Sequence, residues 1–382
     1  MKKKLFIVFD QIPPATAGGL VFTYTQLIPL LGEFYEVEVI SVFESGVNEF
    51  MGRKVHNLIH YQTDVTLSMI KTYFSSGEIL KALNIPFSSL LYYLDIPTGR
   101  RKTAEVLSSA PDSVVLAVSP AAAMYIPKNH PYILEIHSTY DYFYNGGLIQ
   151  KSQIRLMNQP SMILFRTEAD AKKAAGLGNS SFVYNFIKGK AKSEIELSDL
   201  KKRKNRIIFL ARLEEVKDPL RMLHLAELLK KKIPDFTLDI YGSGSMEEPM
   251  KQFILEHGLT DQVHLKGFTN DKSVYQNYSL IWMTSKYEGL GMTLVEAKQM
   301  GVPAVVTCWG DQVYEVVEPG MDGFVCQTDE EFVEKTVMLL ENESMLLDFS
   351  RNALQSFERF GQDQARASWK KILNDFEKEY LN

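Results

Sequence analysis

A pattern of strand, loop, helix and strand occurs twice in this chain of 382 residues, at its start and again near residue 200. The first copy places apolar strands at residues 5–9 and 37–42 on either side of a helix at 21–31. The second places strands at 207–210 and 237–241 around a helix at 219–231. A helix between two such strands crosses back over the sheet, so the strands lie parallel. Each copy therefore predicts the opening of a doubly wound α/β domain.

Continuous apolar runs predict further strands, because a strand covered on both faces of a parallel sheet loses the alternation of a half-exposed one. The chain is 45% hydrophobic and longer than the ~250–300 residues at which a single core stops growing, so we expect two domains. Predicted strands lie at 114–118, 132–136, 162–166, 263–265, 280–283 and 304–307. After residues 323–326 the chain is predicted to be helical, with helices at 329–340, 345–357 and 362–380.

The polar stretch at 190–205 predicts an exposed connection between the domains. Its basic run, Lys-Lys-Arg-Lys at 201–204, can be a solvated linker or a contact with an anionic membrane. The mostly helical stretch at 64–110 contains an aromatic patch at 90–94, which core packing explains more simply than ligand binding. We expect two Rossmann-like domains that face a central cleft, at 1–190 and 191–362, and a helix at 363–382 that returns to the first domain.

Charge and cysteine content narrow the class of protein. The chain has 42 basic and 47 acidic residues and a net charge of -5, which argues against a nucleic-acid binder that depends on a basic surface. Cys308 and Cys326 form neither a disulfide framework nor a metal-ligand spacing, as expected of core thiols. No segment reaches the ~20 apolar residues that cross a bilayer. We expect a cytoplasmic protein and leave open a peripheral association with the inner face of the cell membrane.

The nine residues from Glu288 to Glu296 place two carboxylates on either side of a glycine turn that runs into a helix. Gly289 and Gly291 let the backbone approach a ligand, and the amides that open a helix bind anions. This order suits a nucleotide sugar, in which a diphosphate separates the hydroxyls of a hexose from those of a ribose. For Glu296 a structural alternative is open, because Thr293 and Glu296 also fit a helix capping box.

Charged and glycine-containing loops follow other predicted strands, and in open α/β sheets ligands bind beyond the carboxyl ends of the strands. Arg212 and Lys217 follow the strand at 207–210, and as a pair they can neutralise a diphosphate, whereas either alone is more often a surface side chain. Gly18 and Gly19 precede the first helix and let the backbone approach a phosphate, although their spacing is not that of a dinucleotide fingerprint.

Two weaker signals lie at the ends of other strands. Gly242 and Gly244 follow the strand at 237–241 and keep the neighbouring loop small, which is a packing role with a benefit to ligand binding. His137 follows the strand at 132–136 and is either structural or a contact for a substrate hydroxyl.

The set of motifs resembles the GT-B retaining glycosyltransferases of family 4, and the resemblance covers nearly the whole chain. It is most specific in the second half, where Asp311 to Glu315, followed by Gly320 and Gly323, resembles the helix and turn that come after the donor site. A departure from the family is Ala211, which stands where glycine often precedes Arg-Leu. The aromatic run from Tyr140 to Tyr144 matches no particular acceptor group.

The resemblance implies roles for matching positions. Glu288 binds hydroxyls of the donor sugar, Glu296 the ribose, and His137 faces the sugar. Arg212 and Lys217 stabilise the departing nucleoside diphosphate. The donor-binding residues implied beside these are Gly18, Gly19, Gly242, Gly244, Gly289, Leu290, Gly291, Met292, Thr293 and Leu294.

The expected reaction is the metal-independent transfer, with retention, of a hexose or N-acetylhexosamine from a nucleotide sugar, with UDP the favoured nucleotide. The acceptor is a hydroxyl of a surface glycan, glycolipid, teichoic polymer or glycoprotein. No cofactor is expected, and the chain contains no Asp-x-Asp metal motif. Two alternatives stay open: a catalytically inactive paralogue that serves as partner subunit of a transferase, and an enzyme that epimerises or hydrolyses the nucleotide sugar.

Overall fold

The computed structural model describes residues 2–13, 19–59 and 95–381. Gly18, the aromatic patch predicted at 90–94 and most of the stretch predicted at 64–110 lie outside these residues. The chain divides into two compact units. Unit 1 consists of Met1–Phe165, Ala171–Phe182 and Trp369–Asn382, and unit 2 consists of Arg166–Asp170 and Val183–Ser368.

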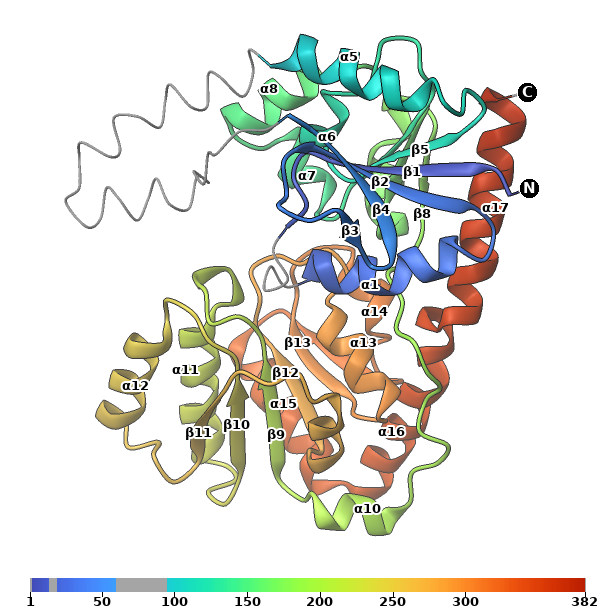
Figure 1. Cartoon of the computed structure of the whole chain (residues 1–382). Helices are drawn as coiled ribbons and strands as arrows, with labels where there is room; N and C mark the ends of the chain where they lie inside the picture. The colour runs from blue at the N-terminus through green and yellow to red at the C-terminus, as the bar shows by residue number, and fades with distance from the viewer. Residues whose placement is uncertain (1, 14–18, 60–94, 382) are drawn as a thin grey trace, which may run out of the picture. The chain divides into compact units, whose positions relative to one another are not determined.

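Unit 1 is built on a sheet whose described strands follow the order β3-β4-β2-β1-β5-β6-β7-β8 (Figure 1). Neighbouring strands are parallel except β3 and β4. All residues of β1 after Lys4 are apolar and buried, as expected of a strand covered on both faces. The strands are β1 (Lys4–Phe9), β2 (Glu36–Phe43), β3 (Glu49–Phe50), β4 (Arg53–Ile59), β5 (Val114–Ala117), β6 (Ile133–Glu135), β7 (Met162–Phe165) and β8 (Ser180–Phe182).

Short helices follow the strands of unit 1. Thr139 caps the start of α7, because its side-chain oxygen accepts a hydrogen bond from the amide of Tyr142. His137 precedes this cap and lies in the short connection between β6 and α7. The described helices are α1 (Gly19–Leu31), α5 (Ile96–Leu107), α6 (Pro120–Ala123), α7 (Tyr140–Tyr144), α8 (Leu148–Leu156), α9 (Glu168–Lys173), which begins in unit 2, and the 3₁₀ turn η1 (Ala175–Leu177).

Unit 2 contains a wholly parallel sheet with the order β11-β10-β9-β12-β13-β14. The strand order reverses between β9 and β12, and the crevice beyond the carboxyl ends of two such strands is where doubly wound sheets bind ligands. The strands are β9 (Arg206–Leu210), β10 (Thr237–Tyr241), β11 (Val263–Gly267), β12 (Leu280–Met283), β13 (Ala304–Thr307) and β14 (Gly323–Cys326).

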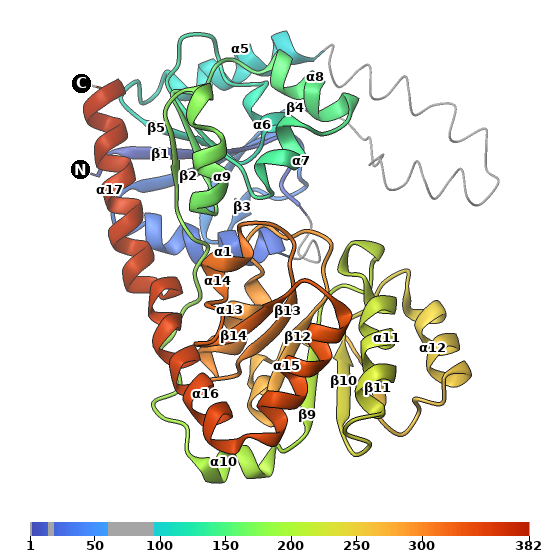
Figure 2. The same ribbon diagram turned by 180° about the vertical axis from the view of Figure 1, so that it is seen from behind.

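Helices cover both faces of the sheet in unit 2. Alternate residues of β12 show this, because Leu280 and Trp282 belong to one core cluster and Ile281 and Met283 to the other. Figure 1 shows α13 on one face, and Figure 2 shows α15 on the other. The helices are α10 (Leu197–Lys202), α11 (Pro219–Lys230), α12 (Glu247–Glu256), α13 (Met292–Gln299), α14 (Val313–Val316), α15 (Asp329–Glu341) and α16 (Glu343–Phe357), with 3₁₀ turns η2 (Glu215–Lys217), η3 (Lys272–Asn277) and η4 (Glu358–Phe360). The last helix, α17 (Gln362–Tyr380), begins in unit 2 and belongs to unit 1 from Trp369 onward.

The predicted fold class, two doubly wound parallel-sheet domains with C-terminal helices, is confirmed. The exposed connection expected at 190–205 is wrong in part, since it contains α10 and the buried residues Ile195 and Leu200. Arg203, within the basic run, is also buried, and burial lowers its pKa to about 10. Its guanidinium donates to the carbonyl of Gly301, 3.2 Å away, so this residue is not part of a solvated linker.

Candidate functional site

The loops that follow β9 and β12 meet where the strand order of unit 2 reverses. There the Lys217 ammonium lies 2.5 Å from Glu288 Oε1, and the two side chains are 15% and 14% exposed. The Ser285 hydroxyl donates to the same carboxylate oxygen at 2.8 Å. The structure therefore brings together two predicted site residues and adds Ser285, which the sequence did not suggest.

Hydrogen bonds to main-chain carbonyls fix these two loops to each other. The Thr284 hydroxyl lies 3.0 Å from the carbonyl of Lys217 and 3.1 Å from that of Asp218, and the amide of Lys286 donates to the carbonyl of Val216 at 2.9 Å. Asp218 adopts a left-handed conformation, φ 49°, as the chain turns from η2 into α11. The backbone at Lys217 is thus held against the loop that carries Glu288.

Arg212, the other predicted cation, lies in the loop directly after β9. Its side chain is exposed, and it makes no hydrogen bond or ion pair with any residue that the structure describes. Arg212 and Lys217 therefore differ: Lys217 is already held by Glu288, whereas the Arg212 guanidinium projects from the loop.

Gly242 and Gly244 have a clear packing role. A Cβ atom on Gly242 would lie 1.8 Å from the carbonyl oxygen of Ala211, and one on Gly244 would lie 2.3 Å from that of Leu213. The close approach permits hydrogen bonds from the Ala211 amide to the Tyr241 carbonyl and from the Leu213 amide to the Ser243 carbonyl, at 3.1 and 2.9 Å. The two glycines thus fix the loop that carries Arg212.

At the glycine turn before α13 the apolar side chains pack into the core, so main-chain groups are left to meet a ligand. Gly291 caps the helix with φ 77°, a conformation that favours glycine. The side chains of Leu290 and Leu294 are buried in the core, and that of Met292 packs against it. The Leu294 amide already donates to the Gly291 carbonyl at 2.9 Å. A ligand at this turn would therefore meet main-chain groups of Gly289 and the first residues of α13.

The capping-box alternative for Glu296 is wrong. Gly291 is the capping residue, so Thr293 lies inside the first turn instead of before it. Glu296 is buried, and its Oε2 accepts a hydrogen bond from the Tyr275 hydroxyl at 2.9 Å and lies 2.8 Å from the ammonium of Lys272. Burial and the adjacent carboxylate raise the pKa of Tyr275 well above its usual value. Tyr275 and Lys272, both in η3, therefore set the position of this carboxylate.

In unit 1, His137 lies beside two buried polar residues. Its Nε2 is 3.3 Å from the hydroxyl oxygen of Tyr24 and 3.9 Å from Glu135 Oε2, and the Tyr24 hydroxyl donates to that same carboxylate oxygen. Burial lowers the pKa of His137 to about 4, so the ring is neutral near pH 7. A neutral imidazole suits contact with an uncharged hydroxyl.

Gly19 and the predicted aromatic run also belong to unit 1. Gly19 is exposed at the start of α1, and its carbonyl accepts a hydrogen bond from the Thr23 hydroxyl at 3.0 Å. The aromatic run forms α7, in which the rings of Tyr140 and Tyr144 stack with centroids 4.9 Å apart. Tyr142 on the same helix is exposed.

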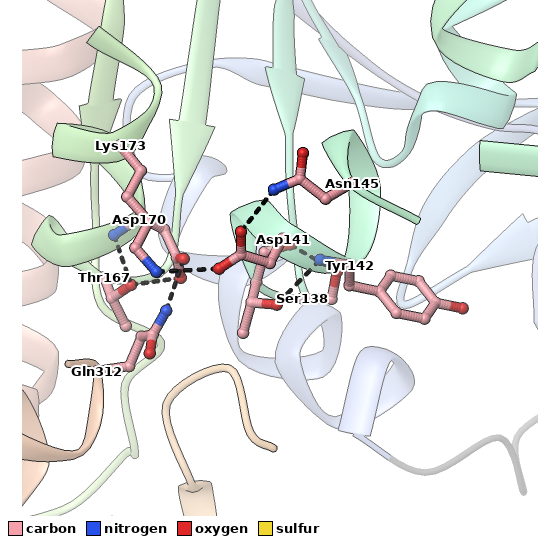
Figure 3. A network of polar contacts seen from close by, with 9 residues as sticks. Ser138, Asp141, Tyr142, Asn145, Thr167, Asp170, Lys173 and Gln312 are labelled. Carbon is pink, nitrogen blue, oxygen red and sulfur yellow. Dashed lines mark hydrogen bonds and ion pairs between the residues drawn. The ribbon is translucent and has the colours of Figure 1, made fainter. Parts of the chain in front are cut away.

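Figure 3 shows polar contacts around two further carboxylates. In unit 1, Asp141 Oδ2 lies 2.9 Å from the Lys173 ammonium, and Asp141 Oδ1 accepts from the Asn145 amide at 2.7 Å. In unit 2, Asp170 accepts at 2.7 Å from both the Thr167 hydroxyl and the Gln312 amide. The latter contact ties α14 to the segment Arg166–Asp170.

Glu315 strengthens this attachment of α14. Its carboxylate accepts hydrogen bonds from the amides of Glu168 and Ala169, at 2.8 and 2.7 Å, at the start of α9. The Tyr184 hydroxyl donates to it at 2.9 Å. The segment expected to follow the donor site thus has an anchoring role that its local sequence does not reveal.

No helix of the described residues is long and apolar enough to cross a membrane. Among the same residues, no group of three or more histidine, cysteine, aspartate or glutamate side chains is placed to hold a metal ion.

Comparison with known families gives a match in the second half of the chain. Residues 191–356 match the family described as Glycosyl transferases group 1. An uncharacterized glycosyltransferase of Haemophilus influenzae is 33% identical over 155 residues, which are 40% of this chain and 44% of that protein. The poly(glycerol-phosphate) alpha-glucosyltransferase of Bacillus subtilis is 30% identical over 174 residues, 45% of this chain and 26% of that protein.

A third relative is the GtfA subunit of the UDP-N-acetylglucosamine–peptide N-acetylglucosaminyltransferase of Streptococcus gordonii. It is 29% identical over 155 residues, 38% of this chain and 30% of the relative. The match therefore spans less than half the length of each of these three proteins.

Two solved structures resemble the chain over nearly its whole length. The crystal structure of TarM has a TM-score of 0.76 and 14% identity, covering 98% of this chain and 99% of that one. The structure of Anabaena Alr3699/HepE in complex with UDP and glucose has a TM-score of 0.69 and 16% identity, covering 98% and 100%. At such identities the likeness shows the fold, which is the GT-B fold of two parallel-sheet α/β domains.

Proposed function

We propose that this chain, whose residues 191–356 form a glycosyl transferases group 1 domain, transfers a hexose or N-acetylhexosamine from a nucleotide sugar to a hydroxyl group. One observation carries the proposal: Lys217 and Glu288 form an ion pair at the point of that domain where the strand order reverses. A carboxylate and a cation held there are chemically suited to a ligand that joins sugar hydroxyls to phosphates.

The proposed roles follow from charge. Lys217 and Arg212 stabilise the negative charge that develops on the departing diphosphate, and fixed cations do this without reorganising during the reaction. Glu288 accepts hydrogen bonds from hydroxyls of the donor sugar, and Glu296 from those of the ribose. The main chain from Gly289 to Thr293 binds the sugar and phosphates, as amides at a helix start are suited to do.

Residues of unit 1 complete the assignment. The proposal keeps the predicted roles of His137, as a contact for a hydroxyl of the donor sugar, and of Gly19, as a main-chain contact for the diphosphate. The neutral state of His137 supports this role, because an uncharged imidazole is suited to a hydrogen bond with an uncharged hydroxyl.

The proposed transfer proceeds with retention and without a metal ion. The acceptor hydroxyl attacks from the face that the nucleoside diphosphate leaves, and the leaving phosphate takes the hydroxyl proton. The bond from the sugar carbon to the phosphate oxygen breaks as the bond to the acceptor oxygen forms. The ion pair with Lys217 supports a binding role for Glu288, because its charge is already matched by a cation instead of being left to attack the sugar carbon.

The names of the relatives favour a UDP-linked donor and an acceptor that is a polymer or a protein. UDP is named with HepE, and poly(glycerol-phosphate) and peptide acceptors are named with the relatives from Bacillus and Streptococcus. For this chain we propose an acceptor hydroxyl on a surface polymer, a lipid-linked glycan or a protein. The proposal includes a cytoplasmic location, at the inner face of the membrane when the acceptor is lipid-linked.

Calorimetric titration tests the donor site without knowledge of the acceptor. UDP, GDP and ADP are titrated into the full chain in EDTA, and Arg212→Ala is compared with the control Arg221→Ala, whose arginine pairs with Asp329 on α15. We expect one nucleotide to bind, with about tenfold weaker affinity in Arg212→Ala, as lost contacts of ~1.4 kcal/mol give. Absence of binding by all three nucleotides would contradict the donor site and favour an inactive partner subunit.

A further inference from the structure

Asp239 is a buried carboxylate in the middle of β10, between the apolar residues Leu238 and Ile240. Its Oδ2 accepts a hydrogen bond from the Arg206 guanidinium on the neighbouring strand β9, at 2.9 Å. Its Oδ1 lies 3.2 Å from Nδ1 of His264, the residue paired with it on β11. Burying a carboxylate costs free energy unless such partners compensate for it. Asp239 is therefore fixed by contacts with the strands on both sides of β10.

The same carboxylate reaches from the sheet to the end of η3. The hydroxyl of Tyr278, a buried residue directly after that turn, donates to Asp239 Oδ2 at 2.7 Å. The Arg206 guanidinium lies over the Tyr278 ring, 5.2 Å from its centroid, and the Tyr241 hydroxyl lies 3.1 Å from the Tyr278 hydroxyl. Tyr278 is thus held to the sheet through both its hydroxyl and its ring.

The turn η3 also carries the two side chains that hold Glu296. The Tyr275 hydroxyl and the Lys272 ammonium both contact Glu296 Oε2, at 2.9 and 2.8 Å. The Tyr278 amide donates to the Tyr275 carbonyl at 3.1 Å, so the two tyrosines belong to one tight unit of chain. The hydrogen bonds of a 3₁₀ turn have poorer geometry than those of an α-helix, so side-chain anchors matter more for its position. A single six-residue turn therefore connects Asp239 to Glu296.

We propose that Asp239 is a positioning residue that anchors η3 through the Tyr278 hydroxyl. The anchored turn, through Tyr275 and Lys272, holds the Glu296 carboxylate in the orientation that accepts hydrogen bonds from the ribose of the donor. The contact between Glu296 and the ribose rests on the proposed function. The anchoring of η3 depends only on contacts within unit 2.

Discrimination between nucleotides with and without ribose hydroxyls measures the orientation of Glu296 separately from stability. Calorimetry compares UDP with 2′,3′-dideoxy-UDP, and the matching guanosine and adenosine pairs, for the native chain and for Tyr278→Phe. We expect the native protein to bind the ribose form about tenfold more tightly and this ratio to fall at least about threefold in Tyr278→Phe. Partial unfolding would weaken both affinities equally and leave their ratio unchanged. A native ratio in Tyr278→Phe would overturn the inference.

A double-mutant cycle tests whether Asp239 acts through Tyr278. Asp239→Ala should lower the ratio, and the double variant with Tyr278→Phe should lower it no further than the larger single effect. The control is His264→Ala, which removes a contact of Asp239 within the sheet and should keep the native ratio. Additive losses, or an equal loss in His264→Ala, would overturn the proposed route. Tyr278→Phe decides the role of the anchor even if Asp239→Ala fails to fold.

Hydrogen exchange of the ligand-free chain tests the anchoring without any nucleotide. We expect the amides of residues 272–278 to exchange faster in Tyr278→Phe than in the native protein, and at the native rate in His264→Ala. If the native protein binds no nucleotide, the proposed function fails, and exchange still decides whether Tyr278 anchors η3. If a nucleotide binds while the ratio and the exchange in Tyr278→Phe both stay native, only the role of Asp239 fails.

Discussion

Lys217 and Glu288 lie 71 residues apart in the chain, yet their side chains meet at 2.5 Å across the loops that follow β9 and β12. Hydrogen bonds from the Thr284 hydroxyl and the Lys286 amide to main-chain carbonyls hold the two loops together independently of the ion pair. The pair is therefore placed by the sheet, and the cation is in position before any ligand arrives. Preorganised charge of this kind is what a reaction with an anionic leaving group requires.

Removal of the cation should affect turnover far more than folding. We expect Lys217→Ala to lower kcat by about 10²–10³, the loss typical of one preorganised group that stabilises developing charge. The control is Lys286→Ala, because Lys286 lies in the facing loop and pairs with the exposed Glu215 at 3.2 Å. Steady-state release of nucleoside diphosphate measures both. Equal activity in the two variants would show that Lys217 does not contribute to turnover.

The glycine at 244 should be required for stability. In Gly244→Ala the new methyl group would lie 2.3 Å from the Leu213 carbonyl oxygen, and such overpacking destabilises by about 1–3 kcal/mol. Gly176→Ala is the control, because a Cβ there meets no atom within 4 Å. Urea unfolding followed by circular dichroism compares the midpoints. Matching midpoints would show that the loop after β10 adjusts without cost.

The Tyr275 hydroxyl should stabilise unit 2 through Glu296. A hydrogen bond to a buried charged group contributes about 1.5–3 kcal/mol, so Tyr275→Phe should lower the unfolding free energy by that amount. Tyr314→Phe, at an exposed tyrosine of the same unit, should change it by less than ~0.5 kcal/mol. Because Glu296 would also lose its alignment, UDP affinity should fall in Tyr275→Phe alone. If Tyr275→Phe altered neither the unfolding free energy nor the UDP affinity, the Tyr275 hydroxyl would neither stabilise unit 2 nor align Glu296.

The depressed pKa of His137 makes stability depend on pH. Its folded value is about 4 and its unfolded value about 6.5, so the unfolded chain binds more protons between them. The contribution of His137 is full above pH ~6.5 and is lost as the pH falls toward 4, by up to about 3 kcal/mol. Thermal unfolding from pH 7 to pH 5 should show a shallower loss in His137→Gln than in the native protein. Parallel curves would show that the ring titrates normally.

The sequence predicted the fold because buried parallel strands leave a clear apolar pattern. The bounds of β10, β12 and β13 equal the predicted ranges. β12 is a wholly apolar run, whereas β10 keeps its apolar residues on either side of the buried Asp239. The strand β4 was missed because its sequence, Arg-Lys-Val-His-Asn-Leu-Ile, mixes polar and apolar residues near the edge of the sheet.

The residues of the candidate site were predictable only where they lie close together in the sequence. Glu288, Gly291 and Glu296 share one short motif, whereas Glu135 and Tyr24 are 111 residues apart and meet only through the sheet. Glu135 also lies within an apolar strand, where nothing in the local sequence indicates a contact with Tyr24. Likewise, the link between Glu296 and Lys272 depends on the packing of η3 against α13, which no spacing rule supplies.

Donor turnover at the site of Lys217 and Glu288 is measured as release of nucleoside diphosphate from UDP-, GDP- and ADP-sugars in EDTA, by the native protein and by Glu288→Ala. Glu215→Ala, on the exposed side of the same loops, is the control. We predict release from one donor, lost in Glu288→Ala and retained in the control. No release from any donor, or equal release by Glu288→Ala, would contradict it.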